Sequence, residues 1–388
     1  MRVLIFTTGP DSEPSSRVRV FQFLDALEAR GVECSVRPLA GRRYLELGYG
    51  LRQLPAPLRA LWVGGHFAFR SIRRLVELVG ACRYDLLLVQ KETFPFGLER
   101  LISWLGIPVV YDFDDAIFAE SRLPDGRGGV LRRLASLVMR RQRALPALLT
   151  RCRAVIAGSP TLAGYANKFS NNVTVIPTVI DARACSQAPL RRSGPLTIGW
   201  IGAPPNAVYL EPLVPVFQTL AGRFDLQVLL VGPEAFECPG VTVTCTGWRH
   251  YDSVAEEVQD LHRIDVGIMP LPETTFAAGK CALKAIQYMA CGIPVVASPV
   301  GVNGEVVSDG ECGFLASSSD EWRDRIAQLL ADPDLRQRMG RAGRARVDAR
   351  YSVHAVLPTL LGVLERAVSP EVPCDTAPRV EGGSTCRT

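Results

Sequence analysis

Short apolar segments alternate with longer amphipathic segments along almost the whole chain, and this alternation constrains the fold most. The short segments are rich in Val, Ile and Leu, and helical periodicity follows most of them. Buried strands separated by helices predict a parallel sheet with helices on both faces. The expected strands are 3–8, 33–36, 86–89, 109–111, 155–157 and 173–176 in the first half, and 196–201, 227–231, 241–245, 266–269 and 294–297 in the second.

The restart of this rhythm at residue 196 predicts two domains, and a chain of 388 residues has room for both. Residues 1–185 would form the first domain and residues 186–352 the second, with a Pro- and Gly-containing linker at 183–195. We expect α/β architecture: two Rossmann-like, doubly wound parallel-sheet domains that face a cleft. A last helix at 353–367 is expected to pack back on the first domain, and the tail 369–388 to be disordered.

Composition excludes several other classes of protein. The chain is 47% hydrophobic and 21% charged with a net charge of +5, which fits a globular enzyme and gives no reason to expect nucleic acid. The 11 cysteines are scattered singly without metal-ligand spacing, which favours free thiols in a reducing cytoplasm. The uncharged stretch at 285–304 is interrupted by Gly and Pro, so a membrane-spanning helix is not expected there.

Two lysines mark a candidate anion site in the second half. The chain has only four lysines, and Lys280 and Lys284 lie within five residues of each other. The pattern predicts one helix that starts beside Gly279, carries both lysines on its first turns and ends at Gly292. A helix N-terminus with lysines attracts anions, and a phosphate is the natural ligand. The alternative is two solvated surface lysines; the flanking glycine and the buried strand that follows favour the phosphate site.

Three carboxylates in four residues follow the strand at 109–111. Asp112, Asp114 and Asp115 would repel one another unless a cation lies near. They could cap the next helix and contact a ligand, bind a metal, or receive a proton and a sugar hydroxyl; we favour capping with a ligand contact.

Glycine or small polar residues follow several strands of the second half, as expected for loops that approach a ligand at the carboxyl ends of parallel strands. These loops are 202–206, 232–233, 246–248, 270–279 and 298–305.

The segment 279–303, GKCALKAIQYMACGIPVVASPVGVN, resembles the group 1 glycosyltransferases of family GT4, which have the two-domain GT-B fold. The resemblance extends to YDFDDA at 111–116, VIP at 175–177 with Asp181, and Gly313-Phe314-Leu315. It also includes Asp332-Pro333 and Gly343-Arg344, so it runs from the first strand to the last helix.

The resemblance implies an enzyme that transfers a sugar from a nucleotide-diphosphate donor with retention of configuration, without a metal or other cofactor. The donor would lie on the second domain, and a glycan, lipid-linked or small-molecule acceptor on the first. Positive charge aimed at the leaving diphosphate would supply catalysis. The implied donor-binding residues are Gly202, Gly279, Lys280, Cys281, Lys284, Gln287, Asn303 and Glu305; acceptor-binding residues are Arg17, Arg19 and Asp112; catalytic residues are Asp114, Asp115, Lys280 and Lys284.

The chain departs from the family pattern inside the implied site. The usual glutamates, eight apart, fall on Gly279 and Gln287; Gln287 could still bond a ribose, but Gly279 cannot act as an acid. The loop 202–206 lacks the common cation, so Lys280 and Lys284 are expected to take over the diphosphate. Glu305 is the remaining acidic candidate of the second domain. Asp114 stands where many relatives have a histidine.

Arginines are interspersed with apolar residues between positions 122 and 153, which predicts a basic amphipathic helix on anionic lipid or, equally, a solvated helix face. The arginines are Arg132, Arg133, Arg140, Arg141 and Arg143. Lipid contact would place a cytoplasmic protein on the inner face of the membrane. Two other functions stay open: a non-catalytic nucleotide-binding protein of this fold, and a different GT-B enzyme such as a sugar-nucleotide epimerase or a phosphorylase.

Overall fold

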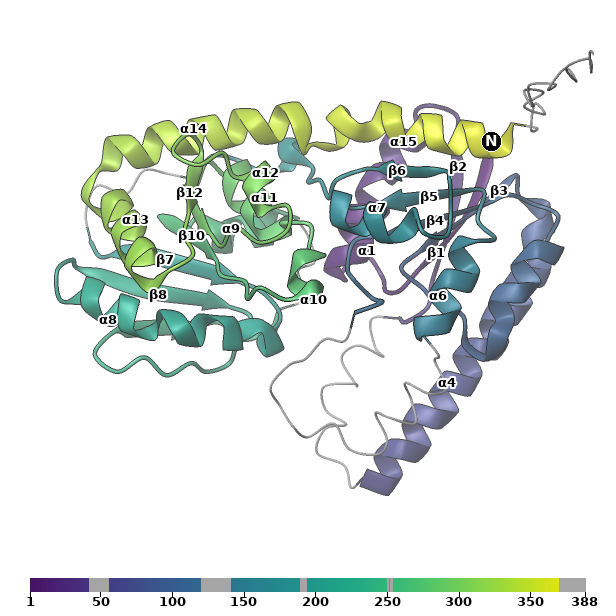
Figure 1. Ribbon diagram of the computed structural model, residues 1–388, viewed down its shortest axis with the longest axis horizontal. Coiled ribbons are helices and arrows are strands. Elements are labelled where there is room, and N and C mark those ends of the chain that lie inside the picture. The colour runs from purple at the N-terminus through teal and green to yellow at the C-terminus, as the bar shows by residue number, and fades with distance from the viewer. Residues whose placement is uncertain (42–55, 120–140, 189–193, 250, 252–253, 370–388) are drawn as a thin grey trace, which may run out of the picture.

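A computed structural model describes residues 1–41, 56–119, 141–188, 194–249, 251 and 254–369. Two six-stranded sheets form two domains that lie side by side (Figure 1). The tail predicted to be disordered lies, apart from Ser369, outside the described residues.

The first sheet is parallel throughout, with the strand order β2-β1-β3-β4-β5-β6. Its central strands are continuous runs of buried apolar residues, as a sheet covered on both faces requires. The strands are β1 (Arg2–Thr7), β2 (Glu33–Pro38), β3 (Leu86–Gln90), β4 (Val109–Phe113), β5 (Ala154–Ala157) and β6 (Val173–Val175).

Helices cover both faces of this sheet. The helix expected near residues 19–30 is interrupted, because the backbone of Val20 (φ −132°, ψ −64°) leaves the helical region. The elements are α1 (Pro14–Arg19), η1 (Phe21–Phe23), α2 (Leu24–Glu28), α4 (Ala56–Val79), η3 (Gly80–Arg83), η4 (Pro95–Trp104), α6 (Arg141–Leu149), α7 (Pro160–Ala166) and η5 (Ala182–Ala184).

The second sheet is also parallel, with the order β12-β11-β10-β7-β8-β9. Its edge strand β12 was not among the strands expected from the sequence, because it has only three residues and begins at a glycine. The strands are β7 (Leu196–Ile201), β8 (Leu226–Val231), β9 (Thr242–Cys245), β10 (Val266–Met269), β11 (Val295–Ala297) and β12 (Gly313–Leu315).

The second domain contains one long helix, α14 (Pro333–Arg350), that the apolar pattern did not predict. Most of its residues are charged or small, so its apolar stripe is narrow. Gly340 permits close packing, since a Cβ atom there would lie 1.9 Å from the carbonyl oxygen of Gly292. The other helices are η6 (Pro204–Leu213), α8 (Val214–Ala221), α9 (Val254–Leu261), α10 (Thr275–Ala278), α11 (Leu283–Ala290), α12 (Asn303–Val306) and α13 (Ser319–Ala331).

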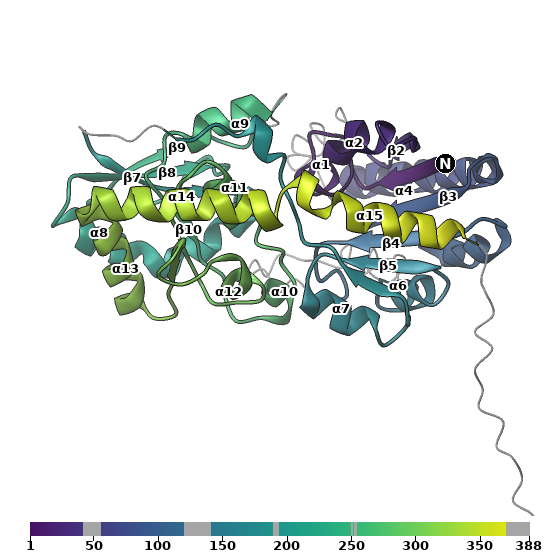
Figure 2. The ribbon, with the colours of Figure 1, turned by 90° about the horizontal axis from the view of Figure 1, so that it is seen from above.

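The end of the chain returns to the first domain. Helix α15 (Val353–Val368) packs its Leu360 and Leu364 into the same core cluster as Val3 and Ile5 of β1. Figures 1 and 2 show α14 and α15 running in line, one on each domain. The backbone N–H of Ile180 donates to the carbonyl of Tyr351 at 3.0 Å, so the two segments that connect the domains are paired.

Candidate functional site

The two lysines of the second domain do not lie on one continuous helix, contrary to the sequence prediction. Helix α10 ends at Ala278, and α11 begins only at Leu283. Ala282 between them has φ +55°, a left-handed conformation that interrupts the helical path. Lys280 therefore lies in the connection, and Lys284 lies in the first turn of α11.

Both lysines contact aromatic rings. The Nζ atom of Lys284 lies 4.4 Å from the centroid of a Trp200 ring, and that of Lys280 lies 4.9 Å from the Phe276 ring. Neither amine has a carboxylate or a hydrogen-bond partner among the residues that the structure describes. Burial, together with the charge of Lys280, lowers the pKa of Lys284 to about 7. A bound anion would oppose both causes of this low pKa, because its negative charge favours the ammonium form of Lys284.

Gly202 brings the end of β7 to Lys284. A Cβ atom at position 202 would lie 2.8 Å from the Lys284 Nζ atom and 2.7 Å from its Cε atom. The Lys284 amine therefore lies at the carboxyl end of a central strand, where open parallel sheets bind their ligands.

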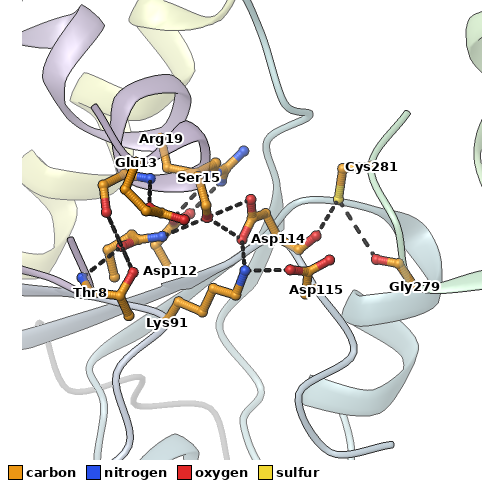
Figure 3. Close-up of polar contacts among 12 residues, drawn as sticks. Thr8, Glu13, Ser15, Arg19, Lys91, Asp112, Asp114, Asp115, Gly279 and Cys281 are labelled. Atoms are coloured by element: carbon orange, nitrogen blue, oxygen red, sulfur yellow. Dashed lines mark hydrogen bonds and ion pairs between the residues drawn. The ribbon is translucent and has the colours of Figure 1, made fainter. Parts of the chain in front are cut away.

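The acidic cluster of the first domain contains its own cations. The hydroxyl of Ser15 donates to both carboxylate oxygens of Asp114, at 2.8 and 2.7 Å, and the Lys91 amine lies 3.4 Å from the same carboxylate. Lys91 also pairs with Asp115 (Figure 3). Burial opposes ionisation of Asp114, but Lys91, Arg19 and Ser15 outweigh it and lower the pKa of this carboxyl group. The cation that the cluster was expected to need is therefore present.

Lys91 has an unusual backbone. Its φ of +57° is one of only two positive φ values at non-glycine positions in the described residues. The Lys91 N–H donates to the carbonyl of Asp112 at 2.7 Å, which ties the end of β3 to the end of β4. Strained residues of this kind concentrate at functional sites.

Arg19 and Asp112 were expected to bind an acceptor, but the structure pairs them with each other. Their side chains are 4% exposed each, and the guanidinium donates to both oxygens of Asp112. Its remaining nitrogen donates to the carbonyls of Ile176 and Pro177, at 2.8 and 3.0 Å. This buried pair connects α1, β4 and the segment after β6 within the first domain, and acceptor binding by its two residues stays a prediction.

Arg17 and Gln287 likewise have partners that the sequence did not reveal. The Arg17 guanidinium forms a 2.6 Å ion pair with Glu257 on α9, and the amide of Gln287 donates to the same carboxylate. Gln287 is 4% exposed, so the ribose contact expected of its amide is not available in this arrangement.

Cys281 and Gly279, which were expected to contact the donor, form contacts between the domains. The Cys281 thiol lies in the core cluster of the first domain and donates to the Asp114 carbonyl at 3.1 Å (Figure 3). A Cβ atom on Gly279 would lie 2.4 Å from the Ala116 Cβ atom. This close approach explains why no acidic side chain stands at position 279.

Asn303 and Glu305 follow β11. Asn303 is completely buried, and its amide donates to the Ser298 carbonyl at 2.9 Å, so it shapes the loop. Glu305 is exposed, and its backbone carbonyl accepts from Arg346 at 2.6 Å. Within the described residues, no hydrogen bond or ion pair joins either side chain to the lysines.

Two further expectations concern metal and membrane. Within the described residues, no three His, Cys, Asp or Glu side chains are grouped so that they could hold a metal ion, and no helix is long and apolar enough to cross a membrane. Arg132, Arg133 and Arg140 lie outside the described residues. Arg141 and Arg143 belong to α6, but their side chains are not described.

Sequence reasoning missed Ser15, Lys91, Trp200 and Glu257 as members of the site. Lys91 could have been identified from the sequence, because it is one of only four lysines and directly follows a strand. Ser15 lies in the loop 7–16 after the first strand, a position where a ligand-binding loop is expected, whereas Trp200 and Glu257 have no local pattern because their partners lie far away in the sequence.

Models of known families match both domains. The model described as Glycosyltransferase Family 4 matches residues 16–184, and the model described as Glycosyl transferases group 1 matches residues 195–332. Together they cover most of the chain. The protein belongs to the group 1 glycosyltransferases of family 4, which confirms the resemblance found in the sequence.

Curated relatives are similar over shorter stretches. The chain is 29% identical over 164 residues to a GDP-mannose-dependent monoacylated alpha-(1-6)-phosphatidylinositol monomannoside mannosyltransferase of Corynebacterium glutamicum, which covers 38% of this chain and 41% of that protein. It is 41% identical over 88 residues to a D-inositol 3-phosphate glycosyltransferase of Segniliparus rotundus, covering 22% and 19%. The chain thus matches less than half the length of these relatives.

Solved structures confirm the GT-B fold. Sucrose-phosphate synthase from Thermosynechococcus elongatus has a TM-score of 0.64 at 17% identity, covering 94% of this chain and 98% of that one. Anabaena HepE in complex with UDP-glucose has a TM-score of 0.59 at 16% identity, covering 94% and 99%.

Proposed function

We propose that the protein is a retaining glycosyltransferase that transfers a sugar from a nucleotide-diphosphate donor to a glycan, lipid-linked or small-molecule acceptor, without a bound metal. One observation carries the proposal. Lys284 lies beside the carboxyl end of β7, the charge of Lys280 acts on it, and neither lysine has an anionic partner in the part of the chain that the structure describes. A diphosphate would supply the missing negative charge.

The lysines act on the leaving group. When the bond from the anomeric carbon to the diphosphate breaks, negative charge grows on the diphosphate oxygens and the sugar becomes oxocarbenium-like. The ammonium groups of Lys280 and Lys284 stabilise that growing charge more than the ground state, which is the condition for catalysis. Because these two cations neutralise the diphosphate, the proposed reaction needs no metal ion.

Asp114 serves the acceptor side. It lies on the first domain, and its backbone carbonyl accepts a hydrogen bond from the thiol of Cys281 on the second domain. Ser15 and Lys91 keep its carboxylate ionised and fixed. An ionised carboxylate between the domains can accept the proton of the acceptor hydroxyl as the new glycosidic bond forms. Asp115 shares Lys91 and supports the same cluster.

The names of relatives narrow the first substrates to test. One relative is named as GDP-mannose-dependent, and a structural neighbour was solved with UDP-glucose. The first of these acts, by its name, on a phosphatidylinositol mannoside, so a lipid-linked acceptor belongs in the screen.

Contact with an anionic membrane on the cytoplasmic side is part of the proposal. Helix α4 supports it with large apolar side chains that are exposed along one stripe: Phe69, Ile72, Val76 and Val79, 63–74% exposed. We expect binding to acidic vesicles that falls steeply with rising salt, and no binding to neutral vesicles. Equal binding to both kinds of vesicle would overturn this part.

The test is a thermal-shift screen of nucleotide sugars, followed by product analysis with the donor that raises the melting temperature most. We expect turnover with retained anomeric configuration, at the same rate in excess EDTA. An absolute requirement for Mg²⁺ or Mn²⁺, or an inverted product, would overturn the mechanism.

The departures at Gly279 and Gln287 favour a second candidate, a nucleotide-binding protein without catalysis. Binding of the donor without release of nucleoside diphosphate, in the presence of a broad set of acceptors, would establish it in place of the enzyme.

A further inference from the structure

An ion pair joins the two domains through one buried carboxylate. Arg17 on α1 belongs to the first domain and Glu257 on α9 to the second, and their charged atoms lie 2.6 Å apart. The side chains are 14% and 5% exposed. The other oxygen of Glu257 accepts from the amide of Gln287 on α11.

Burial makes this pair sensitive to loss of either partner. Burial raises the pKa of Glu257, while Arg17 opposes the shift. A buried charge whose partner is removed remains without compensation, and this costs more than the pair itself contributes. Separation of the domains would take Arg17 away from Glu257 but would leave Gln287 in place, because α9 and α11 belong to the same domain. Arg17 therefore compensates Glu257 only while the domains stay in contact.

The same carboxylate reaches the lysine-bearing helix. Gln287 lies three residues after Lys284 on α11, so the two side chains leave neighbouring positions on the helix surface. The amide of Gln287 is fixed by its bond to Glu257. One side chain thus connects Arg17 of the first domain with the helix that carries Lys284.

We propose that Glu257 is a positioning residue: it holds the domains together through Arg17 and orients Gln287 beside the lysine site. The coupling of this contact to catalysis rests on the proposed function, whereas the contact between domains does not.

The experiment uses two single variants, Glu257→Gln and Arg17→Gln, and one double variant that swaps the charges, Arg17→Glu combined with Glu257→Arg. The matched control is Asp320→Asn, which removes an ion pair to Arg323 of the same 2.6 Å length, but on the surface of α13, where Asp320 is 79% exposed. The full chain is measured by small-angle X-ray scattering and by hydrogen exchange of peptides covering α1 and α9.

We expect both single variants to have a larger radius of gyration and faster hydrogen exchange than the wild type. In the double variant with swapped charges both quantities should return part of the way to the wild-type values, and the control should keep those values. Arg17→Gln keeps the test valid if Glu257→Gln fails to fold, since Arg17 is the more exposed partner. Wild-type scattering and exchange in the folded single variants would overturn the proposal.

Kinetics test the coupling. With an active donor, Glu257→Gln should raise the donor KM about tenfold or more, with a smaller change in kcat. An unchanged KM would overturn the coupling to Gln287. If the wild-type protein turns over no donor, the proposed function fails, while scattering and exchange still decide whether Glu257 joins the domains.

Discussion

The acidic cluster of the first domain (Asp112, Asp114 and Asp115) and the lysine pair of the second (Lys280 and Lys284) differ in more than the sign of their charge. Asp112 pairs with Arg19, and Asp114 and Asp115 share Lys91, so each carboxylate has a cation within the protein. In the described part of the chain, the amines of Lys280 and Lys284 contact aromatic rings and have no carboxylate partner. A cluster of charges in a sequence therefore does not mark a ligand site by itself. The charge that the folded protein leaves without a counterion is the better guide.

The largest expected effect concerns Asp114, the carboxylate that we place at the acceptor side. Asp114→Asn should lower turnover by about 10²–10⁴-fold, because the amide cannot accept a proton. Affinity for nucleoside diphosphate should stay near that of the wild type, since the donor site lies on the other domain. Steady-state kinetics and calorimetry measure the two quantities, with Asp324→Asn as the control because the Asp324 side chain on α13 is 60% exposed. An equal loss of nucleotide affinity would erase the contrast between the acidic cluster and the lysine pair.

The next effect concerns stability. Asp112→Asn should lower the free energy of unfolding by about 3–5 kcal/mol, because Arg19 would keep a buried charge without its partner. Chemical denaturation monitors this change, and the exposed pair of Asp320 and Arg323 provides the comparison. A fully stable Asp112→Asn protein would show that this carboxylate is not structural and would favour it as a candidate for acceptor binding.

A smaller effect should separate Lys284 from ordinary lysines. Its pKa is about 7 in the folded protein and about 10.5 in the unfolded chain, so the unfolded state binds the extra proton between these values. The stability of the wild type relative to Lys284→Met should therefore rise with pH across the window from 7 to 10.5, by at most about 1.4 kcal/mol per pH unit. Saturating nucleoside diphosphate should flatten this slope, because the anion favours the ammonium form. Parallel stability curves for the two proteins would contradict the burial of an uncompensated amine.

The fold could be predicted from the sequence because buried parallel strands consist of continuous runs of apolar residues. Val266–Met269 was expected at the bounds that the structure gives, and the GT-B architecture is confirmed. Helices without a clear apolar face were harder to find: α14 is held by tight packing of Gly340 against Gly292, which no local pattern indicates.

The partners of charged side chains could not be predicted in the same way. Arg17 and Glu257 are 240 positions apart, and only the meeting of two domains brings them together. The break before α11 depends on Ala282, whose positive φ has no counterpart in its residue type. Lys280 and Lys284 could be named from their spacing, but their lack of a counterion within the described residues is visible only in three dimensions.

Calorimetry of nucleoside diphosphate binding tests the central claim most directly. Titration of GDP and UDP at pH 8, in two buffers of different ionisation enthalpy, measures both affinity and proton uptake for the wild type, Lys280→Ala and Lys284→Met. We expect the wild type to bind at least one nucleotide with uptake of a proton by Lys284, whose pKa of about 7 leaves it mostly neutral at that pH. Each variant should lose about 1.5–3 kcal/mol of binding free energy, and Lys284→Met should also lose the proton uptake. Wild-type affinity in both variants would contradict the assignment of these lysines to the donor diphosphate.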